Sequence, residues 1–183
     1  MKIDPSPFLA RDGRKAEIRN ARPSDAGRIL DLATALVASG PHWNLPEADE
    51  FVLSADLIAK SARRSLASEN SLHLLAVAEG EAVASLTMEG CPHRKMRHVA
   101  EIGLGVAGAW RRQGLARALL DAAVREARLS PVLRRLQLRV FSNNLAAHAL
   151  YDAAGFLLEG TQREAVRIGN SYCDQLLMAL SVA

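Results

Sequence analysis

The spacing of apolar side chains along the chain predicts alternating strands and helices. In the first helical stretch, Ile29, Ala33, Leu36 and Val37 recur at the three- or four-residue spacing of one helix face. Helices are predicted at 24–39, 54–68, 114–129 and 145–154. Shorter apolar runs predict strands at 16–20, 72–78, 82–88, 99–106, 136–141, 156–168 and 172–180.

This order of elements predicts a mixed α/β fold. Glu79-Gly80-Glu81 joins two strands as a hairpin turn, and Gly169-Asn170 joins the last two. Residues 1–15 are polar and contain two prolines, so we expect a flexible N-terminal lead-in there. Residues 16–183 contain no internal repeat and no long linker, so we expect them to form a single domain.

Composition excludes several classes of protein. Of 183 residues, 49% are hydrophobic and 23% charged, which argues against wholesale disorder. The longest apolar run, 74–78, is far shorter than the roughly 18 residues of a membrane span. The N-terminus has an acid and two prolines where a signal peptide needs an apolar stretch. We therefore expect a cytoplasmic protein without a membrane partner.

The charge balance is mild, with 23 basic and 20 acidic residues and a net charge of +3. These charges are spread along the chain rather than clustered as on a nucleic-acid-binding face, so no nucleic-acid partner is expected. The two cysteines, Cys91 and Cys173, have no metal-ligand spacing, so no metal site is expected.

The most informative stretch is 104–120, where a glycine-bearing strand leads through a short turn into a helix. Arg111-Arg112-Gln113-Gly114 forms that turn. Unpaired amides at a helix N-terminus, a small glycine and flanking arginines are typical of a phosphate or pyrophosphate site. Neither nucleotide fingerprint, GxxxxGK[ST] nor GxGxxG, fits this stretch. Spacing alone leaves open a capped helix whose arginines are merely solvated.

Two ordered motifs resemble the GNAT N-acetyltransferase superfamily. Its signature [RQ]-x-x-G-x-[GA] is matched by Arg111, Gly114 and Ala116. The segment SNNLAAHALYDAAGF resembles the second motif, with Asn144 and Tyr151 at its key positions. The resemblance covers about 16–180. It implies a central, mostly antiparallel sheet of six to seven strands, splayed in the middle and flanked by about four helices.

The resemblance also implies acetyl-CoA as co-substrate, with no metal. Leu104 and Val106, on either side of Gly105, would pair with the pantetheine arm through their backbone groups, and the Val106 N–H would polarise the thioester carbonyl. Asn144 would contact the cofactor near the splayed gap. The pyrophosphate would lie on the turn and first helical residues, which are Arg111, Arg112, Gln113, Gly114, Leu115, Ala116 and Arg117.

Tyr151 matches the general acid of the family, which protonates the departing thiolate. The alternative is a tyrosine that only packs its helix onto the sheet. The residues leave three candidates for the general base that deprotonates the amine, namely His98, Glu101 and water. Side chains alternate along a strand, so without a bulge His98 and Glu101 lie on opposite faces. His98 then lies on the face of the strand that the general bases of the family usually occupy.

In this fold, the loop between the first two helices usually walls the acceptor pocket. His42 and Trp43 lie in it and either line the pocket or pin the loop to the core. The tail, with Tyr172, Asp174 and Met178, resembles the amino-acid and phosphinothricin acetyltransferase branch, which often forms homodimers.

The resemblance implies an enzyme that transfers acetyl from acetyl-CoA to a primary amine of a small amino-acid-like molecule, by direct attack in a ternary complex. A protein N-terminus, a lysine or an antibiotic amine are alternative acceptors. A non-catalytic acyl-CoA-binding regulatory protein is the alternative from another class.

Overall fold

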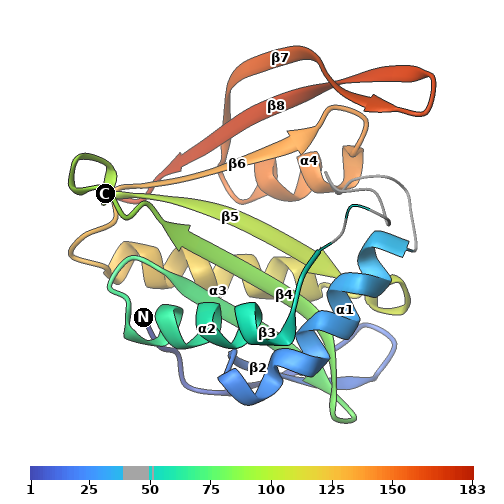
Figure 1. Ribbon diagram of the computed structural model, residues 1–183, viewed down its shortest axis with the longest axis vertical. Coiled ribbons are helices and arrows are strands. Elements are labelled where there is room, and N and C mark those ends of the chain that lie inside the picture. The colour runs from blue at the N-terminus through green and yellow to red at the C-terminus, as the bar shows by residue number, and fades with distance from the viewer. Residues whose placement is uncertain (39–49, 51) are drawn as a thin grey trace.

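The structure is a computed structural model that describes residues 1–38, 50 and 52–183. Its centre is an eight-stranded sheet in the spatial order β1-β2-β3-β4-β5-β6-β8-β7 (Figure 1). Only β5 and β6 run parallel. The strands are β1 (Ser6–Leu9), β2 (Lys15–Asn20), β3 (Leu72–Ala78), β4 (Glu81–Gly90), β5 (Val99–Val106), β6 (Arg135–Phe141), β7 (Leu157–Ile168) and β8 (Ser171–Ser181). The α-helices are α1 (Ala26–Ala38), α2 (Ala55–Ala67), α3 (Leu115–Leu129) and α4 (Leu145–Ala153).

The predicted mixed α/β fold with a mostly antiparallel sheet is confirmed, but the predicted strand number was too low. Residues 6–9 form β1, which pairs with β2 from Ser6↔Ile18 to Leu9↔Lys15. The lead-in prediction is therefore wrong for this segment. A four-residue strand that contains Pro7 has too few alternating positions to stand out. Proline is tolerated here because β1 is an edge strand.

Helices cover both faces of the sheet (Figure 1). Alternation along β3 sends Leu72 and Leu74 to a large core that includes α3 and Tyr151 of α4. Leu75, which points to the other face of β3, packs in a smaller cluster with α1 and α2. Within the described ranges, no helix is long and apolar enough to cross a membrane.

A buried ion pair fixes the start of α1. Asp25, 1% exposed, accepts hydrogen bonds from both terminal nitrogens of Arg19 (2.7 and 2.9 Å) and from the Arg22 backbone N–H (2.8 Å). The bond from Arg19 is the main reason why the pKa of Asp25 falls to about 2. This anchor ties the turn that precedes α1 to β2, and α1 then packs against β4 and β5 in the middle of the sheet.

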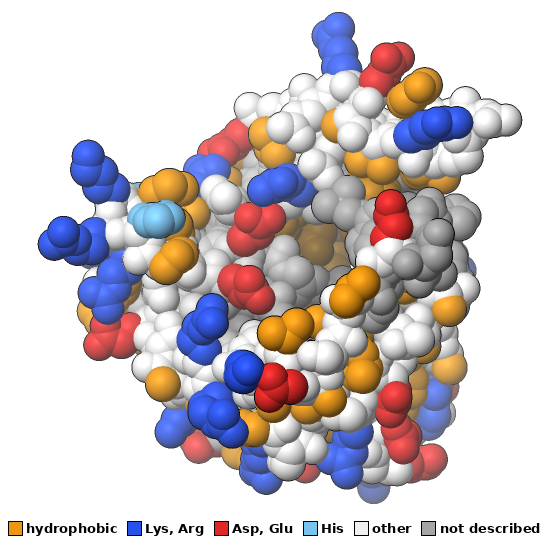
Figure 2. All heavy atoms as spheres, in the orientation of Figure 1, with side chains coloured by type: hydrophobic (Ala, Val, Ile, Leu, Met, Phe, Trp, Pro, Cys, Tyr) orange, Lys and Arg blue, Asp and Glu red, His pale blue; other side chains and the backbone are white. Residues whose placement is uncertain are grey.

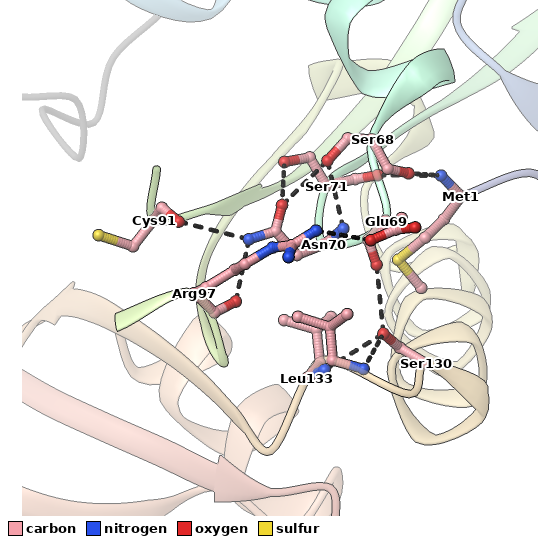
Figure 3. Close-up of polar contacts among 10 residues, drawn as sticks. Met1, Ser68, Glu69, Asn70, Ser71, Cys91, Arg97, Ser130 and Leu133 are labelled. Carbon is pink, nitrogen blue, oxygen red and sulfur yellow. Dashed lines mark hydrogen bonds and ion pairs between the residues drawn. The ribbon is translucent and has the colours of Figure 1, made fainter. Parts of the chain in front are cut away.

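A polar network around Asn70 fixes the segment that leads into β5 (Figure 3). The Asn70 amide nitrogen donates to the Arg97 carbonyl (2.9 Å), and the Ser68 hydroxyl donates to its oxygen (2.9 Å). Arg97 also pairs with Glu69 at 2.6 Å. A Cβ at Gly90 would come within 2.2 Å of Asn70, so a larger residue there would displace this side chain. The start of β5 is thereby held in place.

β7 and β8 form a long hairpin that extends from the rest of the sheet (Figure 1). β7 is an edge strand and most of its residues are exposed. Leu157 and Leu158 are among its exposed apolar side chains. The expected homodimer stays a prediction.

Candidate functional site

The sheet opens in its middle, between β5 and β6. These strands pair only where Val99–Glu101 lies beside Arg135–Gln137, and then they separate. The rest of β5 pairs with β4 alone. A cavity of about 1000 Å³ lies at this opening, lined by residues of α1, β5, β6, α4 and the turn before α3. Figure 2 shows acidic and basic side chains grouped beside a hollow in the middle of the face that carries α1 and α2.

The free edge of β5 presents backbone groups to this cavity. The Ala107 N–H donates to the Val83 carbonyl of β4 (2.9 Å). Because successive residues of a strand point to opposite edges, the N–H groups of Leu104 and Val106 point away from β4 and toward the gap. The Arg111 Nε donates to the Val106 carbonyl (3.2 Å) and ties the turn before α3 to the end of the strand.

Backbone conformation opens the N-terminus of α3. Arg112 and Gly114 have φ of 61° and 88°, in the left-handed region, and Gly114 is the N-cap. Glycine brings no capping side chain, so the amides of the first turn have no side-chain cap. Gly114 and Arg112 line the cavity with Arg111 and Arg117. A helix N-terminus beside guanidinium groups favours a bound phosphate.

Of the predicted cofactor residues, all but Gln113 line the cavity. The Gln113 side chain instead accepts a hydrogen bond from the Asp12 backbone N–H (3.1 Å). Arg117 donates to Asp121 (2.7 Å) and also to the Ala153 carbonyl (3.2 Å). Asn144 accepts from the Ala147 N–H (3.2 Å), so its oxygen caps α4.

Tyr151 lies on α4 with its side chain buried against Phe156, at a ring-centroid distance of 5.7 Å. Its residue exposure is only 7%, and it lines the cavity. Burial raises the pKa of its phenol to about 12. In the described part of the chain its hydroxyl has no hydrogen-bond partner, and at neutral pH it keeps its proton.

The two base candidates occupy different places. Glu101 lines the cavity and lies 3.6 Å from the Arg139 guanidinium on β6. His98 is exposed, precedes β5 and is absent from the described cavity lining. The predicted alternation holds along β5, but residues of both strand faces line the cavity, Ile102 and Leu104 as well as Glu101. Alternation therefore does not decide between the two candidates, and only Glu101 belongs to the described lining.

Several lining residues escaped prediction, among them Arg11, Arg139 and Gln175. Arg139 alternates with the buried Leu138 and Val140, a pattern that could have placed it on the open face. Gln175 is 6% exposed, and its amide makes no hydrogen bond to any described residue. His42 and Trp43, the predicted acceptor residues, lie outside the described residues. Within residues 1–38, 50 and 52–183, no three acidic, histidine or cysteine side chains are grouped to hold a metal ion.

Comparison with known proteins adds to this geometry. Residues 38–156 match the acetyltransferase (GNAT) family. The L-amino acid N-acetyltransferase AaaT of Escherichia coli (strain K12) is 30% identical over 106 residues, which make up 58% of this chain and span 65% of that relative's length. The acetyltransferase of the GNAT family from Streptococcus pneumoniae is 26% identical, with a TM-score of 0.85, over 91% of this chain and 98% of that one. The yncA structure from Salmonella typhimurium, which contains acetyl-CoA, is 18% identical with a TM-score of 0.80, over 92% of this chain and 94% of that one.

Proposed function

Because this chain belongs to the acetyltransferase (GNAT) family, we propose that it uses acetyl-CoA to acetylate the primary amine of a small amino-acid-like acceptor. The observation that carries this proposal is the cavity at the splayed strands. It joins an uncapped helix N-terminus at one end to the Glu101–Arg139 pair at the other.

The residues present fit acetyl-CoA. The first-turn amides of α3 and the neighbouring arginines suit its pyrophosphate. The unpaired edge of β5 suits the amide-bearing pantetheine arm, which can hydrogen-bond to it as another strand would. From Ile102 to Val106 this edge is about 13 Å long at 3.3–3.4 Å per residue. Bound acetyl-CoA would supply an activated acetyl thioester, whose carbonyl oxygen would accept a hydrogen bond from one of the backbone N–H groups that β5 turns toward the gap.

The proton transfers fall to two side chains. An amine is protonated at neutral pH, so its nitrogen can attack only after losing a proton. Glu101, at the acceptor end, accepts that proton directly or through water. Tyr151 holds a proton at its phenol oxygen, where a leaving thiolate can receive it or be hydrogen-bonded by it. Because Glu101 and Tyr151 both line the cavity, a proton acceptor and a proton donor are present together, and attack in a ternary complex needs no covalent enzyme intermediate.

The charges at the acceptor end favour an amino acid. Glu101 attracts the ammonium group, and Arg139 offers a guanidinium to a carboxylate. The buried amide of Gln175 provides a further hydrogen-bonding group. The AaaT relative is named an L-amino acid N-acetyltransferase, which agrees with this assignment.

The experiment is thiol release from acetyl-CoA with a panel of the twenty L-amino acids, their α-carboxamides, polyamines and short peptides. We expect release with one or more free amino acids and a kcat/KM at least about tenfold lower for the matching carboxamide, which cannot pair with Arg139. Arg139→Gln should remove that difference, whereas Arg94→Gln, on an exposed turn, should keep it.

Each negative outcome has its own meaning. Equal rates with amides or peptides would overturn the amino-acid assignment and leave the acetyltransferase intact. Tight acetyl-CoA binding without release to any acceptor would favour the regulatory alternative. Absence of acetyl-CoA binding would overturn the whole proposal.

A further inference from the structure

The turn between β1 and β2 is attached to the phosphate-binding turn before α3. The Asp12 backbone N–H donates to Gln113 (3.1 Å), and the Arg14 guanidinium donates to the Ala109 carbonyl (2.6 Å). Arg14 also stacks on the Trp110 ring at 4.2 Å from its centroid. These contacts hold two segments almost 100 residues apart in the chain side by side.

The turn itself is rigid. The Ala10 N–H donates to the Arg14 carbonyl (2.8 Å), and the Gly13 N–H to the Ala10 carbonyl (3.0 Å). Asp12 accepts from the Arg14 backbone and guanidinium, at 3.1 and 2.9 Å. The residue between Ala10 and Asp12 is Arg11, so its backbone is held on both sides.

Arg11 lines the same cavity as Arg111 and Arg112. Within the described residues its side chain forms no ion pair or hydrogen bond, which leaves its guanidinium free for a ligand. Among the described lining residues the only acid is Glu101, at the far end of β5. Arg11, Arg111 and Arg112 thus line the cavity without a carboxylate beside them in the described lining. Three positive charges together favour an anion with more than one negative charge.

We propose that Arg11 is a cofactor-binding residue whose guanidinium pairs with a phosphate of the nucleotide end of acetyl-CoA. This rests on the proposed use of acetyl-CoA. The acceptor carboxylate is the less suitable partner, because the length of β5 separates Glu101 and Arg139 from the turn that Asp12 contacts. Coenzyme A offers two phosphate groups at this end, the pyrophosphate and the 3′-phosphate, and both match a guanidinium.

Calorimetric titration of CoA into three proteins tests the proposal: the wild type, Arg11→Gln and Arg94→Gln. Both variants lose one positive charge, but Arg94 lies on an exposed turn and does not line the cavity. We expect Arg11→Gln to weaken CoA binding about 5- to 20-fold, the range for a hydrogen bond to a charged group that is partly screened by water. Arg94→Gln should change it less than about twofold.

Dephospho-CoA distinguishes the two phosphates. If Arg11 binds the 3′-phosphate, wild type and Arg11→Gln should bind dephospho-CoA equally. If it binds the pyrophosphate, the difference should persist. In either case the affinity of Arg11→Gln should depend less steeply on salt than that of the wild type.

Other results overturn the proposal. The proposal is wrong if Arg11→Gln binds CoA as tightly as Arg94→Gln does. It is also wrong if Arg11→Gln raises the KM for the acceptor and leaves the CoA affinity unchanged. Wild type that fails to bind CoA would instead refute the proposed function, and the inference with it. The thermal midpoint should match the wild type, because Arg11 makes no described side-chain contact; if Arg11→Gln does not fold, Arg11→Lys, expected to bind with intermediate affinity, replaces it.

Discussion

Replacing Tyr151 by phenylalanine removes only the phenol hydroxyl and so tests its role as proton donor. The ring is buried and packs against Phe156, and phenylalanine retains these contacts. The hydroxyl bonds to no described residue, so its loss removes no hydrogen bond of the free protein. We therefore expect the thermal midpoint to stay within about 2 °C, since substitutions that disrupt no contact change stability by ~0.5 kcal/mol at most.

The expected effect on turnover is much larger. Burial raises the pKa of Tyr151 from 10.0 to about 12, which corresponds to about 2.7 kcal/mol against ionisation at 1.36 kcal/mol per unit. Because a folded pKa of about 12 keeps the phenol protonated, the wild type should show no alkaline loss of activity from this group below about pH 11. Losing a positioned proton donor should lower kcat about 10²- to 10⁴-fold.

The assay is thiol release at saturating acetyl-CoA and the best acceptor of the panel, with calorimetric affinity for CoA measured alongside. We expect kcat to fall while CoA affinity changes less than about threefold, because the substitution leaves the proposed phosphate contacts of α3 untouched. A Tyr151→Phe enzyme that retains more than a third of wild-type kcat would refute the assignment of Tyr151 as donor. A matched control is Tyr172→Phe, since Tyr172 is 63% exposed on β8.

Four further outcomes are expected. Glu101→Gln should lower kcat/KM about 100-fold or more, with unchanged CoA affinity in calorimetry. Gly114→Asp should abolish detectable CoA binding, because it places a negative charge on the N-cap of α3, where the phosphate is proposed to lie. Asp25→Asn should lower the free energy of unfolding in urea at pH 7 by about 3–5 kcal/mol, because it leaves the Arg19 guanidinium buried without its anion. The pKa of Asp25 is lowered from 3.8 to about 2, so the stability that this carboxylate contributes is present above pH 3.8 and is lost as pH falls through about 2. Burial lowers the pKa of His73 from 6.5 to about 4, so the unfolded chain binds a proton at higher pH than the folded protein does. The free energy of unfolding should therefore fall by up to about 3 kcal/mol as pH falls from 6.5 to 4. His73→Leu should remove this pH dependence of unfolding.

Periodicity found most elements because each is long enough to repeat its pattern. The predicted strand 99–106 matches β5, and the helix predicted from 114 begins one residue later, at Leu115, after its N-cap. β1 has four residues and depends on pairing with β2, a contact that local sequence does not encode. Arg11 was missed for the same reason, since only the attachment of its turn to Gln113 and Ala109 brings it to the cavity.

The choice between His98 and Glu101 needed a different signal, which the sequence contains. Alternation correctly separates the two residues, but it does not say which face of β5 is open. Ile102 lies on one face and packs in the core with α3, whereas Gly103 and Gly105 share the other face with Glu101. A Cβ at Gly105 would come within 2.5 Å of the Leu36 Cδ1 atom on α1, so a larger residue there would displace this leucine side chain. Glycine inside a strand often marks the side on which another group comes close. The pair at 103 and 105 therefore identifies the approached face, and Glu101 is the side chain that this face presents to the cavity.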